Sequence, residues 1–220
     1  MPAQALLTCQ NLSRFYPPLT WALKDASLEL FPGDSLAITG ASGSGKSTLL
    51  GLMGLLDSPT SGSLYLAGQE VSKASEKERT RARAQHISFV FQGFHLVQHL
   101  TAWENVTYAL EMRGRPSRQA RKDAAQALEE VGLSHRFSSL PSSLSGGEQQ
   151  RVAVARALAS KSSLILCDEP TGNLDSSNSH KILDLLLAQE DRALVIVTHE
   201  DDIARRCQGQ MVMVDGQLTC

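Results

Sequence analysis

The chain has 220 residues, of which 42% are hydrophobic and 20% are charged, and its formal net charge is −2. This size and composition suit one compact domain, or one domain with a lobe inserted in it. A net charge so close to zero excludes a general attraction to nucleic acid or to an anionic bilayer, so we expect no nucleic-acid partner and infer partners from local features.

The N-terminal residues, MPAQALLTCQNL, lack the basic start and the long apolar stretch of a signal peptide. No window of the sequence approaches the ~20 apolar residues that span a bilayer, so we expect a soluble, cytoplasmic protein. The cysteines show no CxxC spacing, which favours reduced thiols over disulfides or metal ligands. They are Cys9, Cys167, Cys207 and Cys220.

The first third of the chain is expected to form short strands separated by turns, with an antiparallel arrangement and one buried strand. The expected strands are Leu28–Leu30, Leu36–Thr39 and Leu64–Leu66. Residues 47–56 then have the composition of a helix, although Gly51 and Gly54 weaken that prediction.

The middle third is expected to be mainly helical. Ser75 with Glu78, and Thr101 with Glu104, have the S/T-x-x-E spacing of a capping box, so a helix is predicted to begin at each. Between them, residues 87–92 are predicted to form a strand that ends in Gln92. Further on, small and apolar residues recur on one face from 118 to 131 and Gly132 supplies a stop, so this stretch is predicted to be a helix.

The last third alternates strands with helices. Near-continuous apolar strands alternating with helices predict a parallel sheet covered on both faces. The helical insertion in this α/β core is placed at about residues 93–160. The expected elements are strand 164–167, helix 176–189, strand 194–198, helix 201–207 and strand 211–214.

A glycine-rich turn, GASGSGKST, follows the apolar run at residues 36–38. Gly40, Gly45, Lys46 and Ser47 match the pattern G-x-x-x-x-G-K-[ST], with the preceding strand and following helix that the pattern requires. Glycines let backbone N–H groups curl around phosphate oxygens, the lysine reaches the outer phosphates, and the serine ligates Mg²⁺. A flexible loop that contains a lysine by chance is the alternative. The expected phosphate-binding residues are Gly40, Ser42, Gly43, Ser44, Gly45, Lys46, Ser47 and Thr48.

A second motif, LILCDEP at residues 164–170, is an apolar strand that ends in two adjacent carboxylates. Two ionised acids at the end of a buried strand need cations or protons to offset their desolvation. Asp168 is therefore a candidate Mg²⁺ ligand, and Glu169 a candidate general base that polarises an attacking water. The alternative is a strand that simply leaves the core through a polar turn. Together with the glycine-rich turn, this motif predicts hydrolysis of a magnesium nucleotide.

A third motif, LSGGEQQR at residues 144–151, has capping-box spacing between Ser145 and Glu148. Gly146 and Gly147 have no side chains to cover the backbone N–H groups of the first helical turn. The pattern therefore predicts a second anion-binding site. An ordinary capped helix is the alternative. One nucleotide cannot easily contact both the glycine-rich turn and this helix N-terminus of the same chain.

With these motifs in this order, the whole chain resembles an ABC transporter nucleotide-binding subunit. The matching motifs are the P-loop GASGSGKST, the Q-loop at Gln92, the signature LSGGEQQR, the Walker B motif LILCDEP, the D-loop GNLD at residues 172–175, and the switch His199. The resemblance implies a P-loop NTPase (RecA-like) α/β fold, with an N-terminal antiparallel β subdomain and an inserted α-helical subdomain, in a single ABC ATPase domain over residues 1–220.

The resemblance also implies roles for particular residues. Tyr16 would stack on adenine, with Phe15 as the alternative stacker and a core tyrosine as the other interpretation. Gln92 would sense Mg²⁺ and water, with a strand-end amide satisfied within the fold as the alternative. His199 would contact the γ-phosphate and help hold the attacking water, with a structural histidine at a strand end as the alternative. Asp175 would lie at a dimer interface, serve as a helix N-cap, or do both.

The implied working unit is a homodimer around two ATP molecules. Ser145, Gly146 and Gly147 would contact the γ-phosphate bound to the opposite chain, so ATP would favour the closed dimer. Because no membrane segment is expected here, the motion would be passed to separate integral membrane permease subunits. The expected location is the cytoplasmic face of the inner membrane, and a periplasmic adaptor could complete the complex.

Within the family, the stretches GLLDSPTSG and DEPTGNLDSSNS resemble the lipoprotein-release and macrolide-exporter ATPases, which transmit force across the membrane. Glu148 stands where many relatives have Gln. The sequence leaves two alternative functions open. One is a regulatory ATPase that activates cell-wall enzymes through a membrane partner without transport, and the other is an ABC ATPase that acts on ribosomes or DNA.

Overall fold

The computed structural model describes residues 4–18, 20–172, 174 and 176–219. The chain divides into two compact units. Unit 1 comprises residues 1–87, 163–168 and 189–220, and unit 2 comprises residues 88–162 and 169–188. No helix in the described part is both long and apolar enough to cross a membrane.

Unit 1 contains an antiparallel sheet in the order β2-β1-β4-β5, as the sequence predicted for the first third of the chain. Its strands are β1 (Leu7–Tyr16), β2 (Thr20–Leu30), β4 (Ser61–Leu66) and β5 (Gln69–Glu70). The sequence did not predict β1. Its pairing shifts register between Cys9 and Leu12, and Asn11 has a left-handed φ of 50°. A bulge of this kind interrupts the apolar alternation by which a strand is identified.

Unit 1 also contains most of a larger sheet, in the order β10-β9-β3-β8-β7 within this unit. The strands β7, β8, β3 and β9 are parallel, which confirms the predicted α/β core, and β10 is antiparallel to β9. The bounds are β3 (Ser35–Thr39), β7 (Leu164–Asp168), β8 (Ala193–Val197), β9 (Gly209–Val214) and β10 (Gln217–Thr219).

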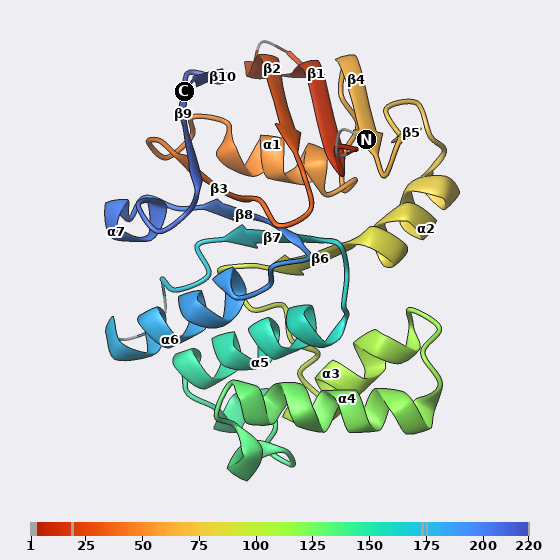
Figure 1. Cartoon of the computed structure of the whole chain (residues 1–220), viewed down its shortest axis with the longest axis vertical. Coiled ribbons are helices and arrows are strands. Elements are labelled where there is room, and N and C mark those ends of the chain that lie inside the picture. Colours follow the sequence, from red (N-terminus) through yellow and green to blue (C-terminus); the bar gives the residue numbers. More distant parts are fainter. Residues whose placement is uncertain (1–3, 19, 173, 175, 220) are drawn as a thin grey trace. The chain divides into compact units, whose positions relative to one another are not determined.

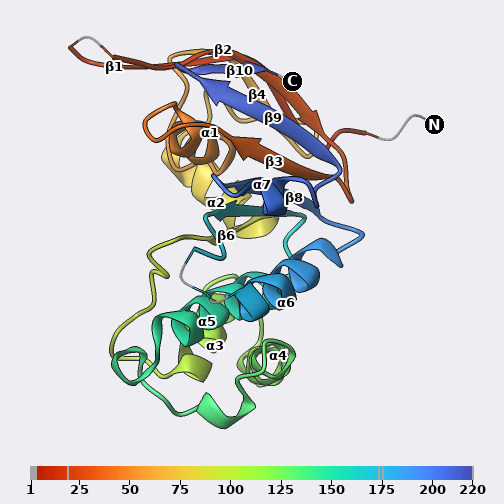
Figure 2. The ribbon, with the colours of Figure 1, turned by 90° about the vertical axis from the view of Figure 1, so that its left-hand side faces the viewer.

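Helix α1 (Lys46–Met53) fills the space between the two sheets of unit 1 (Figure 1, Figure 2). It contacts β1 and β2 on one side and β7 and β8 on the other, and its leucines and Met53 are buried. The helix ends earlier than predicted, because Gly54 is its C-cap and Leu55 is left-handed with a φ of 56°. The other helices of unit 1 are α2 (Glu76–His86) and the short α7 (Asp201–Ala204).

Unit 2 is mainly helical, and α3, α4 and α5 pack against one another (Figure 1). The bounds are β6 (Ile87–Val90), α3 (Ala102–Glu111), α4 (Ser117–Glu130), η1 (Ser134–Arg136), η2 (Pro141–Ser143), α5 (Gly146–Ala159) and α6 (Ser176–Leu187). The predicted capping boxes at Thr101 and Ser145 both form. The expected insertion at 93–160 lies within this unit, which also takes in residues 169–188 because α6 packs on α5.

Candidate functional site

The glycine-rich turn lies between β3 and α1 in unit 1, and close backbone contacts explain two of its glycines. A Cβ added at Gly40 would lie 2.2 Å from the carbonyl oxygen of Met213, and one at Gly45 would lie 2.3 Å from that of Ala22. Gly40 and Gly45 also have φ angles of 146° and 111°. Only glycine fits such close approaches at positive φ, so the loop is held tightly against the neighbouring backbone.

Polar groups in this turn fit a chain of phosphates. Helix α1 begins at Lys46 with no acidic residue in its first turn, so its N-terminal N–H groups favour an anion. The hydroxyl oxygen of Ser44 is buried and has no hydrogen-bond partner among the described residues. Lys46 Nζ donates to the carbonyl oxygens of Gly40 at 2.7 Å and Ala41 at 2.8 Å. The lysine cation therefore lies across the loop.

The remaining residues of the turn differ in exposure. Ser42, Gly43 and Ser47 are exposed, and Thr48 is half-buried. An exposed Ser47 hydroxyl at the start of α1 is accessible to a metal ion bound beside the phosphates.

The parallel strands bring three predicted parts of the site, the glycine-rich turn, Asp168 and His199, to one edge of the sheet. Ile38 of β3 and Asp168 of β7 both pair with Val197 of β8, so the three strands end at the same level. The glycine-rich turn follows β3, Asp168 ends β7, and His199 lies two residues beyond β8. The predicted strand 194–198 thus ends one residue earlier, and His199 lies in a bend after it. Polar groups beyond the carboxyl ends of parallel strands form the usual ligand site of such sheets.

Glu169, the candidate base, belongs to unit 2 and has a left-handed backbone with a φ of 48°. A non-glycine residue in this conformation costs ~1–2 kcal/mol, and such strain often marks a functional site. A Cβ added at Gly172 would lie 3.8 Å from the Cβ of Glu169 and 3.9 Å from the Nε2 of Gln92. Within unit 2, Gln92 and Glu169 therefore both lie next to Gly172.

Gln92 does not end a strand as the sequence predicted, because β6 stops at Val90. Residues 91–94, which include Gln92, form a turn in which the Phe94 N–H donates to the Phe91 carbonyl at 3.2 Å. Arg156 of α5 donates to the carbonyl oxygens of Phe94 at 2.9 Å and of His95 at 2.7 Å. Sequence reasoning missed Arg156, which holds the turn that presents Gln92.

A second missed residue, Gln150, joins the signature helix to the Walker B turn. Its side chain is fully buried, and its Nε2 donates to the carbonyl oxygen of Pro170 at 2.8 Å. Pro170 directly follows Glu169. Gln150 therefore supports the peptide next to the strained candidate base.

The signature motif forms the N-terminus of α5. Ser145 is the N-cap, its hydroxyl accepts from the Glu148 N–H at 3.2 Å, and Gly146 and Gly147 occupy the first turn. The Glu148 carboxylate also pairs with Arg136 Nε at 2.8 Å. The backbone hydrogen bond from Ser145, with the Ser145 hydroxyl and Arg136, lowers the pKa of Glu148 from 4.5 to about 2.

Tyr16, the candidate adenine stacker, is 38% exposed, so it is not a core tyrosine. Its hydroxyl donates to Asp57 Oδ2 at 2.7 Å, and the Arg14 guanidinium lies 4.6 Å from the centre of its ring. Arg14 also pairs with Asp57 at 2.8 Å. The alternative stacker, Phe15, packs on Trp21 with 5.1 Å between the ring centres. Sequence reasoning missed the Arg14–Asp57 pair.

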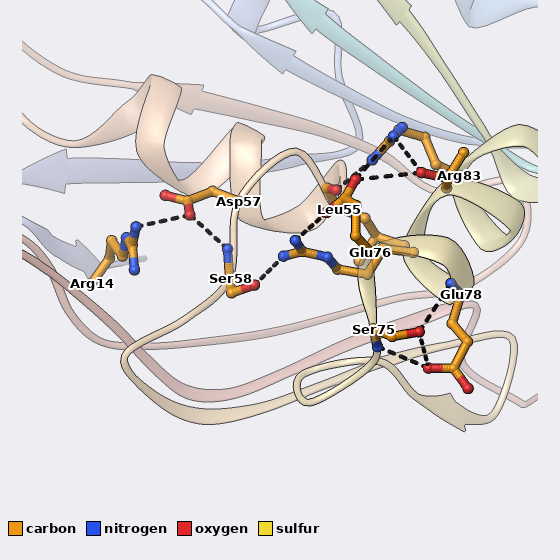
Figure 3. Close-up of polar contacts among 10 residues, drawn as sticks. Arg14, Leu55, Asp57, Ser58, Ser75, Glu76, Glu78 and Arg83 are labelled. Atoms are coloured by element: carbon orange, nitrogen blue, oxygen red, sulfur yellow. Dashed lines mark hydrogen bonds and ion pairs between the residues drawn. The ribbon is translucent and has the colours of Figure 1, made fainter.

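The segment around Asp57 is tied to helix α2 (Figure 3). Arg83 donates to the carbonyl oxygen of Leu55 at 2.6 Å, and Arg79 donates to the hydroxyl of Ser58. The turn whose Asp57 accepts from the Tyr16 hydroxyl is therefore held by two arginines of α2. The remaining candidate, Asp175, lies outside the described residues.

Residues 23–172 match the sequence model of the family described as ABC transporter. The chain is 45% identical over 224 residues to the lipoprotein-releasing system ATP-binding protein LolD of Pseudomonas fluorescens, and the match covers 99% of each chain.

Two solved structures are similar to this chain along nearly its whole length. One is described as a dimeric structure of MJ0796, a bacterial ABC transporter cassette, with 38% identity, a TM-score of 0.91 and 96% of each chain covered. The other is a dimeric post-hydrolysis state of the same cassette bound to ADP and Pi, with 37% identity, a TM-score of 0.89 and 96% of each chain covered.

Proposed function

The chain belongs to the ABC transporter family of ATP-binding subunits, and from that premise we propose that it dimerises around two ATP molecules to drive a separate membrane permease. It is an ATPase, and it is a subunit of a transporter. The observation that carries the proposal is the shared edge of β3, β8 and β7, where the glycine-rich turn, Asp168 and His199 lie together.

In the proposed binding step, the glycine-rich turn holds the phosphates and Tyr16 stacks on the base. Lys46 releases the two backbone carbonyls that it now contacts and donates to the outer phosphates. Ser47, Asp168 and Gln92 are the proposed ligands of Mg²⁺, directly or through water. Bound Mg²⁺ supplies positive charge that offsets the charge of the phosphate oxygens.

In the proposed hydrolysis step, Glu169 accepts a proton from the attacking water, and His199 holds the γ-phosphate and the water in line. The left-handed backbone at Glu169 supports this assignment, since strain of this kind persists where the surrounding structure maintains it. Gln150 maintains it here through Pro170.

In the proposed dimer, Ser145, Gly146 and Gly147 of one chain bind the γ-phosphate held by its partner, and the D-loop residue Asp175 lies at the interface. ATP then binds the closed dimer more tightly than separate chains, so it shifts the equilibrium towards closure. Hydrolysis removes the bridging phosphate and reopens the dimer. The dimeric cassette structures at 37–38% identity support this assembly.

The proposed complex is of the lipoprotein-release type, bound to the cytoplasmic face of the inner membrane through its permease. The 45% identity to a lipoprotein-releasing ATPase over nearly the whole chain supports this branch. It also favours transport over the regulatory alternative. The proposal includes a periplasmic adaptor as a partner of the permease, not as a partner of this chain.

The dimer is tested with the Glu169→Gln variant, which should bind ATP and Mg²⁺ but hydrolyse at least 100-fold more slowly, because it lacks the base. Light scattering should detect dimers with ATP and single chains without it. Adding Lys46→Ala is the matched control and should abolish the dimers. Single chains at saturating magnesium nucleotide would overturn the proposed dimer.

The permease is tested by purifying the tagged chain from detergent-solubilised membranes and identifying the integral membrane proteins that accompany it. A partner with a large extracytoplasmic domain is expected. If depletion of the chain impaired cell separation but left envelope lipoproteins correctly distributed, the regulatory alternative would replace transport.

A further inference from the structure

The signature helix begins with a carboxylate beside the groups that are proposed to bind phosphate. Glu148 Oε2 accepts from the Ser145 backbone N–H at 2.8 Å and from the Ser145 hydroxyl at 2.9 Å. The one hydroxyl proton of Ser145 is therefore directed at a carboxylate. A phosphate arriving at this helix N-terminus meets a like charge and a serine whose proton is already engaged.

An arginine contacts the other oxygen of the same carboxylate. Arg136, the last residue of η1, donates from Nε to Glu148 Oε1 at 2.8 Å. The Glu148 side chain is 12% exposed and that of Arg136 is 40% exposed. The pair thus places a guanidinium at the edge of the signature, where it offsets a largely buried negative charge.

The other two capping boxes among the described residues serve as internal comparisons. Glu78 and Glu104 accept from the backbone N–H of their N-cap residues at 2.8 Å, as Glu148 does, and the Ser75–Glu78 box is visible in Figure 3. The ion pairs that the described residues form include neither Glu78 nor Glu104. Capping therefore does not require an arginine, and the one at Glu148 needs another explanation.

We propose that Arg136 is a positioning residue, which neutralises Glu148 so that Ser145 and Gly147 can bind the γ-phosphate held by a second copy of the chain. Pairing lowers the repulsion between the carboxylate and the phosphate, and it weakens Glu148 as an acceptor for the Ser145 proton. This inference rests on the proposed function, because it requires the ATP-bound dimer.

The test uses Glu169→Gln protein, in which the proposed function expects a stable ATP dimer, and measures the ATP concentration for half-maximal dimerisation by light scattering. Arg136→Gln should raise this concentration about tenfold, or ~1.4 kcal/mol, since solvent partly screens the exposed guanidinium. Arg136→Lys, which keeps the charge, should restore most of the affinity. Arg121→Gln removes the same charge from α4, where the guanidinium lies 5.7 Å from the centre of the Trp103 ring and not on Glu148, and is the matched control.

The decisive measurement is the double variant. Glu148→Gln preserves the capping box, because glutamine serves there as well as glutamate, but it removes the negative charge. In that background, Arg136→Gln should change the dimerisation midpoint less than twofold. An equal tenfold loss in both backgrounds would overturn the proposal, because Arg136 would then act independently of Glu148.

Binding of a fluorescent ATP analogue to single chains, at low protein concentration, separates a local effect from a folding defect. Arg136→Gln should leave this binding unchanged, and weakened binding would point to misfolding and count against the proposal. If the parent Glu169→Gln protein formed no dimer, the proposed function would fail instead. A parent that dimerises while Arg136→Gln behaves identically would refute this inference alone.

Discussion

The hydrogen bond from Gln150 to Pro170 permits a quantitative prediction for Gln150→Leu. A buried hydrogen bond contributes about 1 kcal/mol net, and the left-handed conformation of Glu169 costs ~1–2 kcal/mol. Because these energies are similar, losing the bond should let the turn relax away from the conformation in which Glu169 acts. We expect kcat to fall roughly fivefold and the melting temperature to fall by about 2–4 °C, with unchanged ATP affinity.

The assay is steady-state ATP hydrolysis over a range of ATP concentrations, with thermal unfolding of the same samples. Gln126→Leu is the matched control, since Gln126 lies on the exposed face of α4 and bonds to Glu130 at 2.9 Å. It makes the same chemical change away from the site. If folded Gln150→Leu protein kept a kcat within twofold of the parent, the idea that Gln150 supports Glu169 would be refuted.

Three further changes test other parts of the site. Lys46→Ala should weaken binding of a fluorescent ATP analogue about 10- to 100-fold, because it removes charge-assisted hydrogen bonds, and unchanged affinity would contradict the phosphate cradle. Tyr16→Ala should raise the ATP concentration needed for half-maximal hydrolysis roughly fivefold with little change in kcat, and an unaltered requirement would exclude base stacking. The depressed pKa of Glu148, about 2 against 4.5, contributes stability that is complete above pH 4.5 and lost as pH falls towards 2. The free energy of unfolding of Glu148→Gln protein should therefore fall less steeply than that of the parent as pH decreases over that interval. If urea titrations gave parallel plots of this free energy against pH for the two proteins, the assignment would be contradicted.

Several elements could be read directly from the sequence because their causes are local. The capping boxes at Ser75, Thr101 and Ser145 all form, since each depends on residues three positions apart. The parallel strands were predicted from continuous apolar runs, which indicate burial on both faces. The turn at Gly40–Thr48 was likewise predicted from its pattern and its flanking elements.

Other elements could not be read in this way because they depend on distant contacts. Strand β1 is hidden by its bulge, and β6 stops at Val90 because the following turn is held by Arg156, 62 positions from Phe94 in the sequence. No local pattern predicts such a contact. No local pattern predicts the ion pair of Arg14 with Asp57 either. Arg14 lies in β1 and Asp57 in the turn after α1, so the two residues come together only in the folded unit.

The amino-acid pattern predicts the chemical groups of the candidate site: a glycine-rich turn for phosphates, carboxylates at the end of a buried strand, and a second glycine-rich helix start. These follow from residue type and short spacing. The contacts that support these groups appear only in the folded chain: Gln150 donates to the peptide after Glu169, Arg136 pairs with Glu148, and Arg14 and Asp57 contact Tyr16. They cannot be predicted from local spacing, because each one joins residues from different elements that meet only when the unit packs.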